Sequence, residues 1–417
     1  MPAAIAVRRQ AGGQGFSGDR NRCVRIAVLI DSLAIGGAEA QMALVLPVLR
    51  ARGHDVACIT IAPREALCAT LEAAGIPVRT AADGERMGRG AVAAVIRNLR
   101  AVGRAAAVVR ARRSEILLTV LPHACIVGAM AARLTGTLHI VARRSQNAYQ
   151  HERGAVFGML DRWGTRTARL VLANSEPVRT DLLAEGVEPA RIVRVVNAVV
   201  PKPPPDLRAR EATRAALGLG GDELVLVTVA NLFAYKGHAD IIAALGLLNR
   251  TGAMAGSWRL LVVGRDVDDK GRAVPAEGIG RRAVLERLAS DAGIAAHVQF
   301  LGERADVSGL LEAADIGIHA SLTESFSNAL LEMAAAGLPI VATWVGGANE
   351  LLGQGEAGLL VPPADPVALA EALAVLIRDA SLGRRLAGAA RQRAQASYGV
   401  ASACDSLEAA LSKALSG

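Results

Sequence analysis

Short apolar runs alternate with longer amphipathic stretches along the first half of the chain. The runs predict strands because they are short and almost continuously apolar, whereas the stretches between them carry apolar residues at helical spacing. The predicted strands are Val24–Ile30, Asp55–Ile61, Ile116–Val120, Leu138–Ala142 and Leu170–Ala173, and the first two predicted helices are Ala38–Arg52 and Glu65–Ala74. Such an alternation predicts a parallel sheet with helices on both faces.

A proline-rich segment then interrupts the alternation. Residues 201–205 are Pro-Lys-Pro-Pro-Pro, which cannot continue a helix or a central strand, so they predict a stiff linker. A second unit follows, with apolar segments at Leu224–Ala230, Ile241–Leu248, Leu260–Gly264, Val298–Leu301, Ile316–His319 and Ile340–Ala342. The sequence therefore predicts an α/β protein with two doubly wound, Rossmann-like domains that face a cleft. Ligands of such sheets bind beyond the carboxyl ends of the strands.

We divide the chain accordingly. The predicted parts are a disordered tail (1–22), an N-terminal domain (23–200), a linker (201–206), a C-terminal domain (207–395) and a final segment (396–417) with a helix at Ser402–Leu415. The tail lacks the apolar core of a signal peptide. The five cysteines are scattered and form no CxxC pair, which favours free thiols. We therefore expect a cytoplasmic protein.

Positive charge is concentrated in the first half of the chain. Residues 1–200 contain 27 arginines against 15 acidic residues, and residues 86–114 contain eight arginines and no acid. Arg97, Arg100 and Arg104 recur at helical spacing with apolar residues between them, which is typical of a helix that binds an anionic membrane surface. The alternative is a solvated helix packed on its own sheet. Aromatic residues make up only 3% of the chain, which disfavours nucleic acid as a partner.

The clearest chemical signal is a pair of glutamates, Glu324 and Glu332, that brackets the start of a predicted helix. Ser325 and Ser327 are both candidate N-caps. Unpaired N–H groups at a helix N-terminus bind phosphate, and neighbouring carboxylates can accept hydrogen bonds from sugar hydroxyls. This combination indicates a site for a nucleotide-sugar.

Other motifs restrict the choice of ligand. Neither a GxGxxG after the first strand nor a GxxxxGK[ST] occurs, which argues against a nicotinamide cofactor and against a P-loop. The acidic run at residues 266–269 falls in a predicted surface loop. We therefore expect no cofactor and no essential metal. We expect Lys236 and helix dipoles, in place of a metal ion, to stabilise the negative charge of the phosphate groups.

Five motifs in order resemble the retaining glycosyltransferases of family 4, which have the GT-B fold. The motifs are Ile30-Asp31-Ser32-Leu33 with Gly36-Gly37-Ala38-Glu39, then Ala173-Asn174-Ser175, Lys236-Gly237-His238, Phe300-Leu301-Gly302, and the Glu-x7-Glu segment with Gly346-Gly347. The resemblance covers nearly the whole chain. It implies that the C-terminal domain binds the nucleotide-sugar donor, that the N-terminal domain binds the acceptor, and that the last helix crosses back to the N-terminal domain.

The resemblance also implies roles for residues that bind the donor. Lys236 would bind the departing diphosphate, Glu324 would face the transferred sugar, and Glu332 would accept the ribose hydroxyls. The main-chain amides of Phe326, Ser327 and Asn328 would bind phosphate, and the loop at Gly36 and Gly37 would line it.

For three further positions the sequence leaves more than one role open. His123 follows a predicted strand, in a region where related enzymes have a histidine near the sugar, and the alternative is a structural histidine. Arg144 is a candidate for binding an anionic acceptor or the sugar, and the alternative is a surface arginine. The family usually has a Gly-Arg pair where this chain has Ala230-Asn231, so one positive charge is missing. Arg265 is the candidate to replace it.

Together these observations predict a glycosyltransferase that moves a sugar, with retention, from a nucleotide-sugar to a glycan or lipid-linked acceptor. We expect it to act in polysaccharide or lipopolysaccharide synthesis, at the inner face of the cell membrane. Two alternatives stay open. A sugar-nucleotide epimerase of the same fold would need acid and base carboxylates in the N-terminal domain, where no clear pair is found, and a non-catalytic binding protein would fit the loss of arginine at Asn231.

Overall fold

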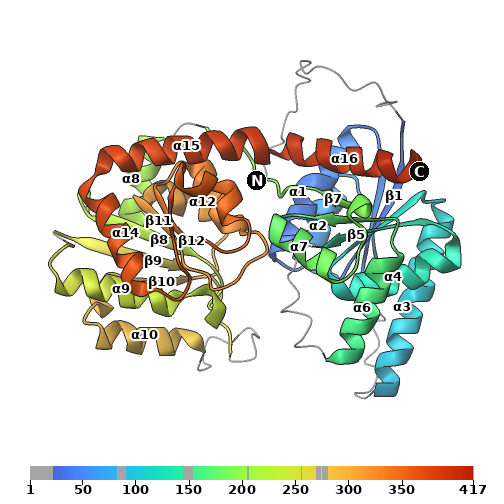
Figure 1. Ribbon diagram of the computed structural model, residues 1–417, viewed down its shortest axis with the longest axis horizontal. Coiled ribbons are helices and arrows are strands. Elements are labelled where there is room, and N and C mark those ends of the chain that lie inside the picture. Colours follow the sequence, from blue (N-terminus) through green and yellow to red (C-terminus); the bar gives the residue numbers. More distant parts are fainter. Residues whose placement is uncertain are drawn as a thin grey trace.

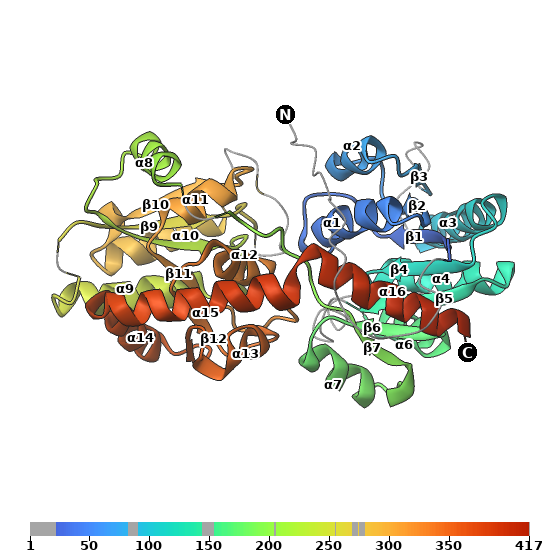
Figure 2. The same ribbon diagram turned by 90° about the horizontal axis from the view of Figure 1, so that it is seen from above.

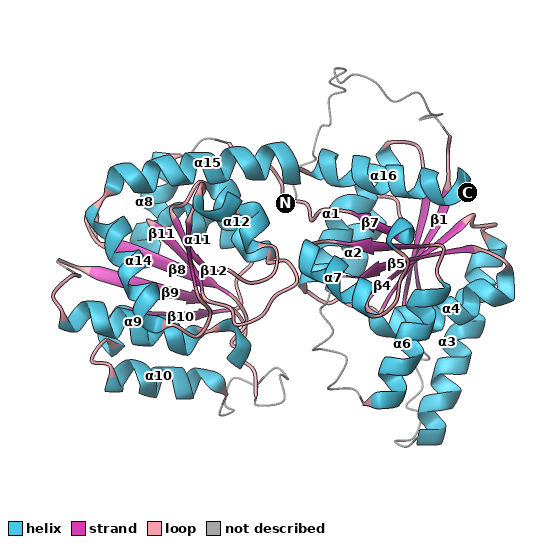
Figure 3. Cartoon of the chain, in the orientation of Figure 1, coloured by secondary structure: helices cyan, strands magenta, loops and turns pink. Residues whose placement is uncertain are grey.

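The computed structural model describes residues 22–81, 91–143, 154–203, 206–254, 256–268, 274 and 280–416. Within them the chain forms two parallel sheets, each flanked by helices on both faces (Figures 1 and 3). This confirms the predicted fold class of two doubly wound domains. The predicted tail lies outside the described residues, except for Arg22.

The N-terminal sheet has seven strands in the order β3-β2-β1-β4-β5-β6-β7. The two faces of β1 pack against different helices because successive residues point to opposite sides. Val28 and Ile30 join a core with α1, α2 and α16, whereas Ala27 and Leu29 join a core with α3 and α4. The elements are β1 (Arg25–Ile30), α1 (Gly37–Ala51), β2 (Asp55–Thr60), α2 (Ala66–Ala73), β3 (Val78–Thr80), α3 (Ala91–Ala111), β4 (Ile116–Val120), α4 (Pro122–Thr135), β5 (Leu138–Arg143), α6 (Ala155–Thr167), β6 (Leu170–Ala173), α7 (Glu176–Ala184) and β7 (Ile192–Arg194).

The C-terminal sheet has six strands in the order β10-β9-β8-β11-β12-β13. Its elements are α8 (Leu207–Ala216), β8 (Leu224–Val229), α9 (His238–Arg250), β9 (Trp258–Val263), α10 (Arg281–Asp291), β10 (Val298–Gly302), α11 (Val307–Ala313), β11 (Ile316–His319), α12 (Asn328–Ala336), β12 (Ile340–Thr343), α13 (Ala348–Leu351), β13 (Leu359–Val361), α14 (Pro366–Arg378) and α15 (Ala380–Tyr398). In both sheets the strand order reverses next to the first strand, between β1 and β4 and between β8 and β11. Loops at such a switch point form the ligand-binding crevice of open α/β sheets.

The chain crosses between the domains twice, at two segments that pair with each other. Val199 bridges to Gly399, and the Val199 N–H donates to the Tyr398 carbonyl at 2.8 Å. Beyond Gly399, α16 (Val400–Ser416) continues from α15 over the N-terminal domain (Figures 1 and 2). Leu407 and Leu411 are buried there, in the core that α1 also lines. The final helix therefore belongs structurally to the N-terminal domain.

The described residues contain neither a membrane-spanning helix nor a cluster of metal ligands. None of the helices in this part of the chain combines the length and the apolar character that a membrane crossing requires. In the same residues, no group of three or more histidine, cysteine, aspartate or glutamate side chains is arranged to hold a metal ion.

The packing of α16 predicts that the last residues stabilise the N-terminal domain. Leu411→Ala should lower the free energy of unfolding by about 2–5 kcal/mol because it leaves a cavity between α16 and α1. The neighbouring exposed residue provides the control, since Ser412→Ala should change stability by less than about 0.5 kcal/mol. Urea unfolding followed by circular dichroism measures both, and equal effects of the two substitutions would contradict this packing.

Candidate active site

The loops that follow β8 and β11 meet at the switch point of the C-terminal sheet. The Leu322 N–H donates to the Tyr235 carbonyl at 2.7 Å. Gly237 has a φ of 70°, and a Cβ atom there would lie 1.9 Å from the Ala320 carbonyl oxygen. Only glycine permits this approach, which brings Lys236 next to the loop that carries Glu324.

Lys236 and Glu324 form an ion pair where these two loops meet. The Lys236 ammonium contacts Glu324 Oε1, and the two side chains are only 18% and 11% exposed. The same carboxylate oxygen accepts a hydrogen bond from Ser321 Oγ at 2.9 Å and lies 3.6 Å from His319 Nε2. Two of the three residues predicted as catalytic, Lys236 and Glu324 but not His123, are thus in direct contact, although 88 positions separate them.

The environment keeps Glu324 ionised. Burial alone would raise its pKa, but His319 and Lys236 outweigh that effect and lower the pKa to about 2. His319 and Ser321 were missed in the sequence analysis. The signal that could have indicated them is their position at the carboxyl end of a buried strand, His319 as its last residue and Ser321 just beyond it, where parallel sheets bind ligands.

Helix α12 begins beside this pair. Of the two candidate caps, Ser327 is the N-cap, and its hydroxyl accepts a hydrogen bond from the Leu330 N–H at 3.3 Å. Glu332 lies one turn after Asn328, so both residues are on the same face of the helix. Burial raises the pKa of Glu332, and the ammonium of Lys202 partly offsets this effect.

The N-terminus of α12 contacts the N-terminus of α1, which belongs to the other domain. Asn328 Nδ2 donates to the Gly37 carbonyl at 2.9 Å. Gly36 is the N-cap of α1, so the glycine loop and the Ser327 loop lie next to each other across the two domains. Both helix N-termini carry partial positive charge and favour an anionic ligand. Gly37 and Asn328, two predicted donor-binding residues from different domains, are therefore in direct contact.

Arg265 lies beside the position where the family's arginine is missing. The Asn231 side chain accepts a hydrogen bond from the Arg265 N–H at 3.0 Å, and Leu232 donates to the Arg265 carbonyl at 3.0 Å. Gly264 allows this approach, because its φ is 156° and a Cβ atom there would lie 2.0 Å from the Ala230 carbonyl oxygen. The main chain of Arg265 therefore lies next to Asn231, the position at which the family usually has an arginine.

The remaining candidates belong to the N-terminal domain. His123 is on the first turn of α4, after β4, and its Nε2 forms a 2.9 Å hydrogen bond with Asn98 Oδ1. Asp31 joins the loop after β1 to the same helix, because its carboxylate accepts a hydrogen bond from the Ala124 N–H at 2.6 Å. Arg144 lies outside the described residues.

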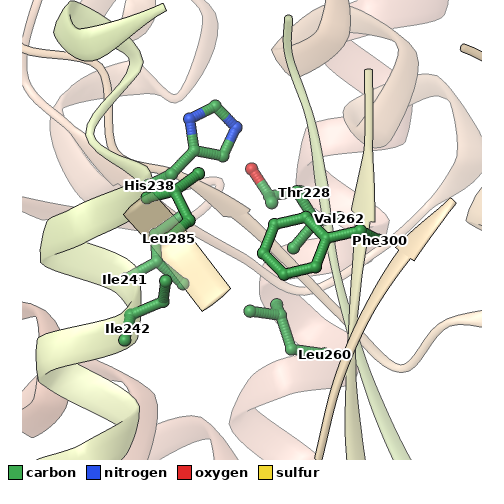
Figure 4. A pocket seen from close by; sticks show the side chains of 8 residues that line it. All are labelled: Thr228, His238, Ile241, Ile242, Leu260, Val262, Leu285 and Phe300. Carbon is green, nitrogen blue, oxygen red and sulfur yellow. The ribbon is translucent and has the colours of Figure 1, made fainter. Parts of the chain in front are cut away.

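The C-terminal domain also contains a small apolar cavity, which none of the predicted site residues lines. It lies between α9 and the sheet and is lined by Thr228, His238, Ile241, Ile242, Leu260, Val262, Leu285 and Phe300 (Figure 4). It has no room for a water molecule. Burial lowers the pKa of His238 to about 4, which keeps the imidazole neutral there. We therefore interpret the cavity as part of the hydrophobic core.

Two family models match consecutive parts of the chain and together account for most of it. The model for glycosyltransferase family 4 matches residues 35–202, and the model for glycosyl transferases group 1 matches residues 209–393. The chain belongs to glycosyltransferase family 4.

Curated relatives match only in part. A D-inositol 3-phosphate glycosyltransferase from Jonesia denitrificans is 30% identical over 221 residues, which are 53% of this chain and 48% of the relative. A phosphatidyl-myo-inositol mannosyltransferase from Mycobacterium leprae is 44% identical over 66 residues, or 16% of this chain and 18% of the relative. The chain thus spans about half or less of the length of these relatives.

Solved structures match over nearly the full length. Anabaena HepE in complex with UDP has a TM-score of 0.77 at 22% identity, covering 94% of this chain and all of HepE. WaaG, a glycosyltransferase involved in lipopolysaccharide biosynthesis, has a TM-score of 0.67 at 20% identity, covering 91% of this chain and 98% of WaaG. At this identity the likeness establishes the GT-B fold.

The lowered pKa of Glu324 predicts a pH dependence of stability. The folded-state pKa is about 2, below the ordinary value of 4.5, so the contribution to stability is complete above pH 4.5 and is lost as the pH falls toward 2. It amounts to at most about 3 kcal/mol. Glu324→Gln should therefore flatten the decline in the free energy of unfolding between pH 4.5 and 2. Urea unfolding at several pH values measures this.

Glu211→Gln removes an exposed carboxylate and should leave the decline unchanged, and the prediction fails if Glu324→Gln behaves the same way.

Proposed function

We propose that this protein is a retaining glycosyltransferase that moves a sugar from a nucleotide-sugar to a hydroxyl of a glycan or lipid-linked acceptor. The observation that carries the proposal is the buried Lys236–Glu324 pair beside the N-terminus of α12, with the glycine loop of the other domain across from it. Membership of family 4 and the shared fold with HepE, which was solved with UDP and with UDP-glucose, support it.

In this proposal the C-terminal domain binds the donor. The amides of Phe326, Ser327 and Asn328 and the ammonium of Lys236 hold the diphosphate, and the Glu332 carboxylate accepts hydrogen bonds from the ribose. The bond between the anomeric carbon and the diphosphate oxygen breaks, and the acceptor oxygen attacks from the same face. Its proton passes to the departing phosphate oxygen. Lys236, Arg265 and the helix dipoles stabilise the developing negative charge.

Glu324 and His123 act on the sugar rather than on the phosphate. The ionised Glu324 stabilises positive charge at the anomeric centre and binds sugar hydroxyls, and it forms no covalent intermediate. His123 approaches the sugar from the N-terminal domain, and Arg144 is proposed to bind the acceptor.

Turnover of nucleotide-sugars tests the activity. The purified protein is incubated with UDP-, GDP- and ADP-sugars in the presence of EDTA, and nucleotide release is followed together with the anomeric configuration by NMR. Slow release that depends on Glu332 and Lys236, with the configuration retained, supports the proposal and a metal-independent reaction. Interconversion of free nucleotide-sugars would indicate an epimerase, and binding without turnover on any acceptor would indicate a binding protein.

Removing the positive charge of Lys236 or Arg265 should weaken binding of the phosphate groups but not of the nucleoside. Lys236→Met and Arg265→Met should each weaken binding of the preferred nucleoside diphosphate about 10–100-fold, because each removes one charge-assisted contact. Binding of the nucleoside without phosphates should change by less than about twofold. Isothermal titration calorimetry with both ligands measures this difference. Lys413→Met serves as the control, since Lys413 bonds to the Ala190 carbonyl in the N-terminal domain. Equal losses for nucleoside and diphosphate would contradict these roles.

We also propose that the N-terminal domain binds the inner face of the cell membrane. The N-terminal halves of α3 and α6 extend from the domain in the same direction (Figure 1). They expose the apolar side chains Val95, Ile96 and Leu99 of α3 and Val156, Met159 and Leu160 of α6. Arginines of α3 lie beside them, which suits an interface with anionic lipid headgroups.

Co-sedimentation with vesicles tests membrane binding. The double variant Leu99→Ser/Met159→Ser should reduce binding to vesicles that contain anionic lipid by roughly tenfold or more, because two exposed apolar side chains no longer enter the bilayer interface. Leu288→Ser, which alters an exposed leucine of the C-terminal domain, is the control. Wild-type binding that is equal on neutral and anionic vesicles, or unaffected by the double variant, would contradict the proposal.

A further inference from the structure

A chain of amide side chains joins the two domains at the candidate active site. Asn328 Oδ1 accepts hydrogen bonds from Gln41 Nε2 at 3.1 Å and from Asn197 Nδ2 at 2.7 Å. Asn197 Oδ1 in turn accepts from Asn174 Nδ2 at 3.3 Å. Gln41, Asn174 and Asn197 are each only 3% exposed. Four amide side chains thus connect α1, the end of β6, the crossover segment and α12.

Gln41 also holds the segment that crosses between the domains. Its Oε1 accepts from the Ala198 N–H at 2.5 Å, and its Nε2 donates to the Ala198 carbonyl at 2.9 Å. Ala198 directly precedes Val199, which bridges to Gly399 at the second crossover. The amide chain therefore runs from the crossover segment at Ala198 to the first residue of α12.

Such a network favours one arrangement of the domains. A buried amide group that loses its partner costs free energy, so a rotation that separated Asn328 from Gln41 and Asn197 would be opposed. Asn328 also donates to Gly37, which fixes the spacing between the two helix N-termini. Its own main-chain N–H is independent of these side-chain contacts.

We propose that Asn328 is a positioning residue. Through Gln41 and Asn197, its side chain couples the crossover segment at Ala198 to the donor site, and it holds the N-termini of α1 and α12 at the separation that a diphosphate needs. This inference rests on the proposed function and adds to it a role for side chains that do not bind the ligand. Substitution of the Asn328 side chain leaves the main-chain phosphate donor in place.

A double-mutant cycle tests the coupling. Asn328→Ala removes three hydrogen bonds, and Gln41→Met removes the clamp on Ala198 with little change of shape. Each single variant should weaken binding of the nucleoside diphosphate that the wild type prefers (among UDP, GDP and ADP) by about tenfold. The double variant should bind no more weakly than the weaker single variant, because both substitutions break the same network. Calorimetric titration of full-length protein, with folding checked by circular dichroism, gives these affinities.

A second contact between the domains provides the matched control. Glu350 accepts from the Glu176 N–H at 2.6 Å and pairs with Arg194, and this contact includes none of the four amide side chains. Glu350→Gln weakens this contact and should change nucleotide affinity less than twofold. In steady-state assays the donor KM should rise in the Asn328 and Gln41 variants while kcat changes less than threefold.

The outcomes separate the inference from the proposed function. If the wild type binds none of the three nucleotides, the proposed function fails and the inference fails with it. If the wild type binds but the single variants bind equally well, or their effects simply add, the inference alone is wrong. The same holds if Glu350→Gln weakens binding as much as Asn328→Ala does.

Discussion

The site depends on the contact between Lys236 and Glu324. Two charges this deeply buried are stable only when paired and hydrogen-bonded, and here the pair is completed by Ser321 Oγ at 2.9 Å. The pair in turn requires the close packing of two loops, which Gly237 permits. One glycine, one ion pair and the parallel order of β8 and β11 therefore fix the geometry from which the rest of the candidate site extends.

Much of the fold could be predicted from the sequence, because apolar strands that are buried on both faces leave a clear pattern. The start of α12 was also predictable, from two serines before a run of helix-forming residues. The Lys236–Glu324 contact was not, because no spacing rule relates loops that far apart in the chain. The resemblance identified both residues, but only the sheet order brings them together.

The side-chain role of Asn328 was missed for a different reason. The resemblance implies only a main-chain role for Asn328, since any residue at a helix start offers an N–H group. Its partners Gln41 and Asn197 are ordinary polar residues in sequence and become informative only through burial and contact. Arg265 was predictable in part. The family pattern indicated that an arginine was missing at Asn231 and that Arg265 was a candidate to replace it, but only the structure shows that the Arg265 N–H donates to the Asn231 side chain.

The ion pair need not be broken when a donor binds. A lysine ammonium has three N–H donors, and Glu324 uses one of them, so Lys236 can hold the carboxylate and a phosphate oxygen at the same time. The carboxylate then fixes the direction of the ammonium before the ligand arrives, which lowers the cost of ordering the side chain on binding. It also cancels part of the positive charge, and this gives a physical reason for the second cation at Arg265 and for the two helix N-termini. In the proposed function, a lysine whose charge is partly cancelled needs other positive groups beside it to stabilise the departing diphosphate. The N-termini of α1 and α12, which meet at the contact between Gly37 and Asn328, would be such groups.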